Sequence, residues 1–459
     1  MNELTYFPLS PEQESMLFLE GLFGPGIFHN MRVTVAVPEG IGVDAVREAV
    51  TCFQQRQDAL RTRLCGRSPF LQTVTADTAD LVVTTAGPGE GAVALLERRR
   101  GELLNTEQHR GEAARTHFEL VQDAEGYERH LTVALDHFTC DGNSAAVVAA
   151  DLTRLLEGHG DLGPLPKGFA DLCRDRTTGA GAQREKELRG WTAALEQVEP
   201  LTGLMPHRSV GVASAADATP LTRSQVDSTF VGSELYDLVT AVSETHESTP
   251  FAVMSALTAL VIWRRSGRNG FVLFSPVSTR RDAASEVAVG LFAHDRPVVC
   301  RVDPDQPLSA FMKAMMAGTW RGFRGALLSV PELAREIPEF GRTLLDDGAE
   351  YIQLHVWMED ADDAHAADPV ERRVVTEHGV FEPSHDLTVT TWRFGFSPGR
   401  TTLRSYFGGP AAGLEVSEEI GHEVLTLLRA AAGADDGPVG RLVESTLGAA
   451  IASPHRPEH

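Results

Sequence analysis

The stretch that decides the fold is DHFTCDG, residues 136–142, which joins a strand to a helix. Apolar and polar residues alternate over 129–138, which predicts a half-buried strand, and an Ala/Val/Leu-rich helix is expected over about 143–157. On such a strand His137 faces the apolar side, and Asp136 points to the other face. A neutral imidazole accepts a proton near pH 7, so His137 is a candidate general base. Taken alone, however, a strand-end histidine is more often a hydrogen-bonded structural residue.

Strands and helices continue to alternate on both sides of this stretch. Ser10 and Gln13 predict a capping box at the start of a helix that has Pro11 in its first turn. Further strands are expected at 31–37 and 271–277, and further helices at 43–53, 250–263, 307–323 and 414–432. Both halves therefore belong to the α/β or α+β class.

A polar, Gly/Ala-rich stretch at 175–190 has few packing anchors and marks the expected domain boundary. We expect an N-terminal lobe over 1–180 that carries DHFTCDG, a C-terminal lobe over 181–450 and a flexible tail over 451–459.

DHFTCDG resembles the HHxxxDG motif of the condensation-domain superfamily of nonribosomal peptide synthesis. Other segments between about residues 8 and 430 resemble further motifs of this family in the family's order: the opening helix motif at Leu9–Gln13, RHExLRT at Arg56–Thr62, the entry to the second lobe at Trp191–Pro206, the strand-end Arg motif at Ser275–Arg280, IGxFVN at Val289–Ala293 and the late DL motif at Ser384–Leu387. Several motifs in one order argue against chance agreement. The resemblance implies two chloramphenicol acetyltransferase-like lobes, each a mixed sheet with flanking helices, that form a V around a central tunnel.

The resemblance also implies a role for individual residues. His137 is the active-site histidine and faces the tunnel. Asp141 is a structural carboxylate that pairs with Arg280 and holds the motif loop. Gly142 is small so that a phosphopantetheine arm can pass close to the backbone, which a residue without a side chain allows.

The later motifs supply the candidate substrate-binding residues, Ser275, Phe292 and Asp386. The sequence also departs from the family pattern near the site. Asp136 replaces the first motif histidine, and because it faces away from the tunnel we expect it to support the site and not to take part in the chemistry. Gln57 replaces the His of RHExLRT, and Ala293-His294 replaces Asn-Thr after IGxFV. Both departures concern the family's expected contacts on the acceptor side of the site.

Two other interpretations of DHFTCDG are less favoured. Asp136, Asp141 and Ser144 fit the DxxxxDxxS pattern of heterocyclisation domains, but those domains lack the histidine that is kept here at 137. Cys140 beside His137 suggests a thiol nucleophile, yet a buried bystander thiol is the simpler interpretation.

Composition limits the partners. The chain has 459 residues and a formal net charge of −23, which disfavours nucleic acid and anionic membranes as partners. No apolar run approaches the roughly 20 residues that span a bilayer, and the N-terminus does not resemble a secretory signal. The five cysteines form no CxxC pair and no metal-binding spacing, which is typical of a cytoplasmic protein with reduced thiols.

The sequence thus predicts a stand-alone cytoplasmic condensation enzyme of natural-product biosynthesis that forms an amide or ester bond. Its acyl donor is expected on a carrier protein in trans, because no carrier or adenylation motif is found, and its acceptor is an amine or alcohol, free or carrier-bound. No metal and no tightly bound cofactor is implied, since the carrier supplies the phosphopantetheine. The alternatives are an O-acyltransferase that uses acyl-CoA or carrier-bound chains, and a catalytically degenerate fold that recruits partners. The retained His137, Asp141, Gly142 and Arg280 argue against degeneration.

Overall fold

The computed structural model describes residues 5–24, 30–66, 70–105, 110–111, 116–159, 162–177, 181–206, 221–324, 327–358, 372–377 and 387–449. It confirms the mixed α/β class, with helices packed on mixed sheets. The chain forms two compact units: the first comprises Met1–Leu17, Gly26–Arg184 and Ser278–His294, and the second comprises Phe18–Pro25, Glu185–Val277 and Asp295–His459.

The segment Ser278–His294 belongs to the first unit, whereas the sequence placed it in the C-terminal lobe. The reason is apolar packing, because Ala288, Val289 and Phe292 are buried in the core of the first unit. The chain therefore leaves the second unit after Val277 and returns to it at Asp295.

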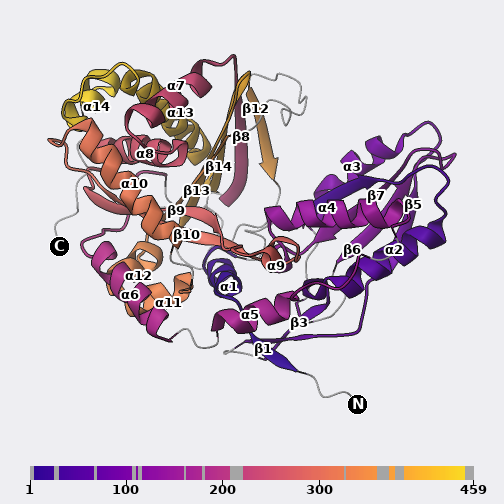
Figure 1. Ribbon diagram of the computed structural model, residues 1–459. Coiled ribbons are helices and arrows are strands. Elements are labelled where there is room, and N and C mark those ends of the chain that lie inside the picture. Colours follow the sequence, from indigo (N-terminus) through magenta and orange to yellow (C-terminus); the bar gives the residue numbers. More distant parts are fainter. Residues whose placement is uncertain are drawn as a thin grey trace, which may run out of the picture. The chain divides into compact units, whose positions relative to one another are not determined.

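The first unit is built on a four-stranded sheet that has helices on both faces (Figure 1). Its strand order is β2 (Met31–Ala36), β7 (Arg129–Leu135), β6 (His117–Gln122) and β5 (Leu81–Thr85), and β5 and β6 run parallel while the other pairs are antiparallel. Leu131 and Val133 pack against α2 (Val43–Arg56) and α4 (Gly142–Leu156) on one face. Val121 packs against α3 (Ala92–Asn105) on the other face.

A small sheet completes the first unit, with the order β1 (Tyr6–Pro8), β4 (Leu71–Val74) and β3 (Thr62–Cys65). Helix α1 (Pro11–Phe23) follows β1 and begins with the predicted capping box: Ser10 N donates to Gln13 Oε1 at 3.1 Å, and Gln13 N donates to Ser10 Oγ at 3.2 Å. Helix α5 (Phe169–Thr177) begins where the Asp58 carboxylate accepts the backbone N–H of Phe169 at 2.7 Å.

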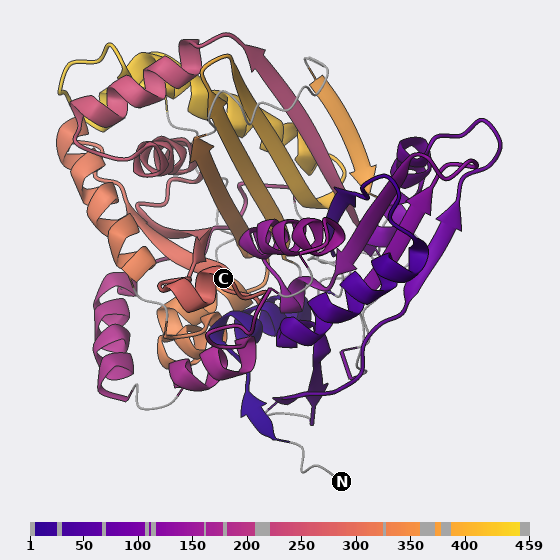
Figure 2. The same ribbon diagram turned by 45° about the vertical axis from the view of Figure 1, so that its right-hand side comes forward.

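The second unit contains a seven-stranded sheet with the order β10 (Ala293–Arg301), β9 (Gly270–Ser278), β11 (Glu350–Met358), β13 (Thr388–Ser397), β14 (Arg400–Pro410), β8 (Leu221–Val231) and β12 (Arg372–Glu377). Strand β11 pairs in parallel with both β9 and β13, and the pairs β13–β14, β14–β8 and β8–β12 are antiparallel. Helices α7 (Glu234–Thr245), α8 (Pro250–Ser266) and α13 (Gly413–Ala431) cover one face of this sheet (Figures 1 and 2).

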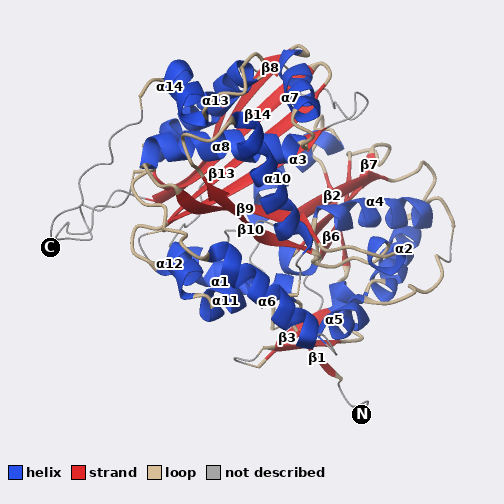
Figure 3. Cartoon of the chain, turned by 60° about the vertical axis from the view of Figure 1, so that its left-hand side comes forward, coloured by secondary structure: helices blue, strands red, loops and turns tan. Residues whose placement is uncertain are grey.

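Further helices are α6 (Gly181–Leu195), α10 (Leu308–Arg324), α11 (Val330–Glu336), α12 (Pro338–Leu345) and α14 (Val439–Leu447), which Figure 3 labels. The short helix α9 (Ala283–Glu286) is labelled in Figure 1. Helix α6 begins inside the polar stretch 175–190, whose described residues are exposed or half-buried, as expected of a stretch with few packing anchors. Trp191, just beyond the stretch, is buried, and Glu187 forms an ion pair with Arg296 at 2.8 Å, so tertiary contacts stabilise a helix that its polar sequence does not predict. Within the described ranges, no helix combines the length and the apolar character needed to span a bilayer.

Candidate active site

His137 lies in a short turn between β7 and α4. The strand ends at Leu135, and His137–Thr139 form a single 3₁₀ turn, η2. The expectation that the strand runs on to Phe138, with His137 on its apolar face, is therefore wrong. The Asp136 carboxylate accepts the Phe138 backbone N–H at 3.0 Å, which caps the turn and ends the strand. The imidazole is half-buried, so it is partly accessible where strand and helix meet.

Asp136, which stands where the family has a histidine, is held by Arg110. Arg110 Nε lies 2.9 Å from Asp136 Oδ2, and Arg110 Nη2 lies 3.0 Å from Oδ1, so the ion pair is bidentate. The same guanidinium lies 4.6 Å from the centre of the Phe138 ring. Because Asp136 also holds the Phe138 backbone, the ion pair fixes both neighbours of His137, which supports a structural role for Asp136.

We expect Asp136→Asn to lower the free energy of unfolding by about 1–3 kcal/mol, because the largely buried Arg110 guanidinium loses its counter-ion. Urea denaturation measures this change. Arg47→Met is the matched control, since its ion pair with Asp44 is exposed and such pairs contribute about 0–1 kcal/mol. An Asp136→Asn protein as stable as Arg47→Met would contradict the structural role of this pair.

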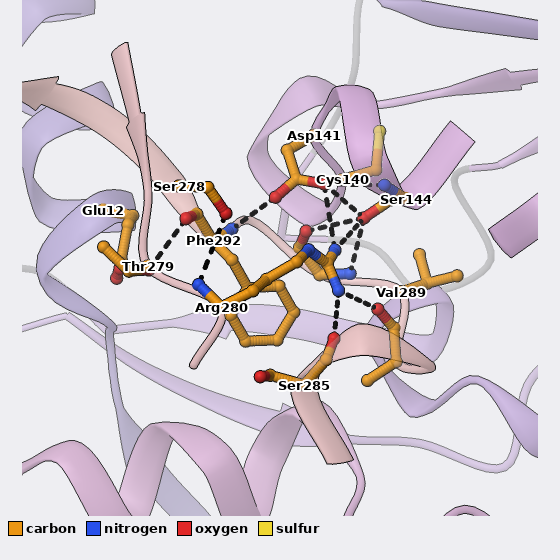
Figure 4. A network of polar contacts seen from close by, with 12 residues as sticks. Glu12, Cys140, Asp141, Ser144, Ser278, Thr279, Arg280, Ser285, Val289 and Phe292 are labelled. Atoms are coloured by element: carbon orange, nitrogen blue, oxygen red, sulfur yellow. Dashed lines mark hydrogen bonds and ion pairs between the residues drawn. The ribbon is translucent and has the colours of Figure 1, made fainter. Parts of the chain in front are cut away.

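Asp141 and Arg280 form the ion pair that the resemblance implies (Figure 4). Arg280 Nη2 lies 2.9 Å from Asp141 Oδ1 and 2.8 Å from Ser144 Oγ, and both charged side chains are buried. Asp141 also caps α4, because its Oδ1 accepts the Ser144 backbone N–H at 2.7 Å. A single carboxylate thus caps the start of α4, directly after the His137 turn, and binds the segment 278–294.

The VGLFA stretch at 289–293 is bound to the same network through its backbone. Phe292 N donates to Asp141 Oδ2 at 3.0 Å, and Gly290 N donates to Ser144 Oγ at 3.1 Å. Val289 N donates to Gln57 Oε1 at 2.9 Å, so the Gln that replaces the motif His holds this stretch. A Cβ at Gly290 would lie 2.3 Å from the Phe169 ring, which explains why glycine is needed there.

A second buried ionic contact fixes the same segment, and the sequence did not reveal it. Glu12 is buried and bonds to Thr279 Oγ1 and to the guanidinium of Arg176, whose Nη2 also donates to Thr279 O at 3.1 Å. Burial opposes ionisation of Glu12, but Arg176, His294 and the Thr279 hydroxyl together lower the pKa of its carboxyl below its usual value. Glu12 and Thr279 lie inside quoted motifs, which was the available signal; Arg176 lies outside them.

Cys140 does not act as a nucleophile in this arrangement. Its thiol is fully buried and donates to Asp136 O at 3.4 Å. Burial raises the pKa of the thiol well above its usual value, and Asp141 and Asp136 raise it further, so the reactive thiolate is disfavoured. Among the described residues, no group of His, Cys, Asp and Glu side chains is arranged to hold a metal ion.

The other predicted site residues differ in how far they are exposed. Gly142 is exposed, and apart from its chain neighbours and its own helix backbone no atom lies within 4 Å of the position that a Cβ would take. Phe292 is buried, with its ring 4.3 Å from the Arg280 guanidinium, and Ser275 is buried in β9. A substrate-binding role for Phe292 and Ser275 stays a prediction. Asp386 lies outside the described residues.

Comparison with known proteins agrees with these motifs. A family model described as "Condensation domain" matches residues 3–338. The cyclosporin synthetase simA of Tolypocladium inflatum is 20% identical over 331 residues, which cover 69% of this chain but 2% of the synthetase. The beauvericin nonribosomal cyclodepsipeptide synthetase of Beauveria bassiana is 21% identical over 329 residues, which cover 68% of this chain and 10% of that protein. The chain thus spans a small part of the length of these relatives.

Solved structures share the fold. The condensation domain of the monacolin K polyketide synthase MokA superposes with a TM-score of 0.70 at 15% identity and covers 95% of this chain and 100% of its own. The SgcC5 protein of Streptomyces globisporus superposes with a TM-score of 0.67 at 20% identity, with coverage of 94% and 100%. With the family match extending over most of the sequence, the chain belongs to the condensation-domain family.

Proposed function

We propose that this protein is a condensation enzyme that joins a carrier-bound acyl thioester to an amine or alcohol, with His137 as the general base. The observation that carries the proposal is a partly accessible histidine in a turn that two buried ion pairs hold, Asp136–Arg110 on one side and Asp141–Arg280 on the other. Fixed geometry of this kind is what general-base catalysis requires. Membership of the condensation-domain family supports the reaction class.

In the proposed reaction, the acceptor N–H or O–H gives its proton to the neutral imidazole as the nucleophile attacks the thioester carbonyl carbon. The tetrahedral intermediate then expels the carrier thiolate, which takes the proton back from the imidazolium. The new C–N or C–O bond replaces the C–S bond, so no redox step or added cofactor is required. His137 thus returns to its neutral form at the end of each turnover.

The donor in this proposal arrives on a separate carrier protein. An acyl group on a phosphopantetheinylated carrier is expected to react about tenfold faster or more than the same group on N-acetylcysteamine, because carrier docking adds binding energy that the small thiol lacks. Product formation followed by mass spectrometry measures both rates. Equal rates at equal donor concentration would contradict a docking contribution, and faster reaction of the acyl-CoA would favour the O-acyltransferase alternative.

Carrier proteins are typically acidic, so the basic run Arg98, Arg99 and Arg100 on α3 is one candidate for a carrier contact. The structure pairs each of these arginines with a carboxylate: Arg98 with Glu90 at 3.1 Å, Arg99 with Glu102 at 3.4 Å, and Arg100 with Glu97 at 3.6 Å. Their charge is locally compensated, so the described contacts do not favour this run as the docking site.

A further inference from the structure

The sheet of the second unit has one apolar face and one polar face. Trp392 on β13 points to the helical side, because its Nε1 donates to Ser417 O of α13 at 2.8 Å, and Phe394 lies in the same core. Successive side chains of a strand alternate between faces, so Arg393 points to the opposite side. Three helices cover the apolar face, and the polar face carries charged side chains.

One row of residues runs across this polar face. The strand register pairs His355 of β11 with Arg393 of β13, Arg393 with Arg404 of β14, and Arg404 with Asp227 of β8. Arg404 is exposed and forms an ion pair with Asp227 at 2.8 Å. The row therefore contains two arginines side by side but one carboxylate, which Arg404 already holds.

Arg393 has no anionic partner within the described ranges. No hydrogen bond or ion pair joins its guanidinium to a described residue, and its Nε atom is buried. The guanidinium lies 4.7 Å from the centre of the Tyr406 ring. The neighbouring acid Asp295 accepts hydrogen bonds from Tyr351 at 2.6 Å and Gln353 at 2.5 Å. Burial lowers the pKa of the Arg393 guanidinium and Arg404 lowers it further, while Tyr406, Asp295 and Asp227 oppose this shift.

His355, the neighbour of Arg393 in the row, also carries a buried polar atom that could bind a ligand. Its Nε2 is buried and has no hydrogen-bond partner among the residues that the structure describes. Burial, and then Arg393, lower the pKa of the imidazole well below its usual value, so His355 is neutral at pH 7. A neutral imidazole can donate one hydrogen bond to a ligand. The exposed ring of Trp357 lies 6.0 Å from the imidazole, which adds an apolar surface.

We propose that Arg393, assisted by His355, binds the carboxylate of a small organic molecule on this face of the sheet. A guanidinium matches the planar geometry of a carboxylate, and buried polar groups that lack partners are normally satisfied by a ligand or water. A carboxylate fits better than a phosphate dianion, because the row has a single uncompensated cation. Tyr406 and Trp357 on the same face favour a planar apolar group next to the carboxylate.

This proposal rests on the proposed function in one respect: if the chain is a condensation enzyme, the bound carboxylate belongs to one of its substrates. The binding test below involves no turnover. A chain that binds the probe but forms no product would contradict the proposed function alone, and a chain that forms product but does not bind the probe would contradict the carboxylate site alone.

The test is isothermal titration calorimetry of the full chain with sodium benzoate, and separately with benzamide and inorganic phosphate. Benzoate is expected to bind about tenfold more tightly than either, because the amide lacks the charge and phosphate lacks the ring. Arg393→Met should weaken benzoate binding about tenfold or more, and Arg393→Lys should weaken it less, since lysine keeps the charge but loses the planar fork.

Arg404→Met is the matched control, because Arg404 lies in the same row but is exposed and paired; it should change benzoate affinity by less than about twofold. Arg393→Met should melt no lower than the wild type in the absence of ligand, since it removes a charge that forms no ion pair with a described residue. Equal binding of benzoate, benzamide and phosphate would overturn the proposal. An Arg393→Met protein that keeps wild-type affinity for benzoate, or melts well below the wild type, would do so too.

Discussion

Replacing His137 with alanine is expected to lower the rate of product formation by about 10²-fold or more, with little change in stability. The imidazole is half-buried in a turn that the Asp136 carboxylate caps through the Phe138 N–H, so its removal leaves this capping bond in place. The loss should therefore come from the missing proton acceptor. Mass-spectrometric product formation measures the rate, and thermal melting followed by circular dichroism reports on the fold.

His130→Ala is the matched control for this prediction. His130 lies on β7 in the same unit and contacts Glu128 at 3.5 Å, so its loss tests whether removal of any histidine from this strand affects turnover. We expect near-wild-type rates from this variant. A folded His137→Ala protein with near-wild-type turnover would rule out the base role and leave a mechanism based on positioning alone.

Asp141→Ala and Arg280→Ala are each expected to lower the free energy of unfolding by about 3–5 kcal/mol, because each leaves the other charge buried without its partner. Asp141→Ala should be the worse of the two, since it also removes the cap of α4, which contributes about 1 kcal/mol. The double variant should lose less than the sum of the single losses, because neither charge is then stranded. Urea denaturation of all four proteins measures this coupling.

Asp141→Asn separates the two roles of the carboxylate. The amide oxygen can still accept the Ser144 backbone N–H, but the negative charge opposite Arg280 is gone. We expect this variant to be destabilised about as much as Arg280→Ala. Additive single and double variants would show that the two side chains are not energetically coupled, and the proposed support of the His137 turn would then lose its physical basis.

Local sequence patterns predicted helices correctly where capping residues mark both ends of the helix. The helix expected from Thr249-Pro250 to Gly267 is an example: Thr249 accepts the Ala252 N–H at 3.2 Å, and Gly267 ends the helix with a φ of +68°. One expectation was wrong because a local side-chain contact outweighs the alternating pattern: the Asp136 side chain caps the following turn and ends β7 before His137. Helix α6 was not predicted, because Trp191 and the distant Arg296 stabilise it in a polar stretch.

The candidate site was predictable only in part. The Asp141–Arg280 pair came from the resemblance to the family, since nothing in the spacing of two residues so far apart indicates a contact. Arg110 belongs to no quoted motif, and its role depends on the replacement of a motif histidine by Asp136. The charged row at Arg393 depends on strand register, which a single sequence does not reveal for non-neighbouring strands.

The membership of Ser278–His294 in the first unit has a consequence for synthesis on the ribosome. After residue 184 emerges, roughly ninety residues of the second unit must be translated before this segment appears, which takes several seconds at about 5–20 residues per second. During that interval Asp141 and Glu12 lack Arg280 and Thr279, and Phe169 has no Phe292 to pack against. The nascent first unit is therefore incomplete for longer than its position in the chain suggests, and a fragment that stops near residue 184 would have the His137 turn but lack the Asp141–Arg280 ion pair next to it.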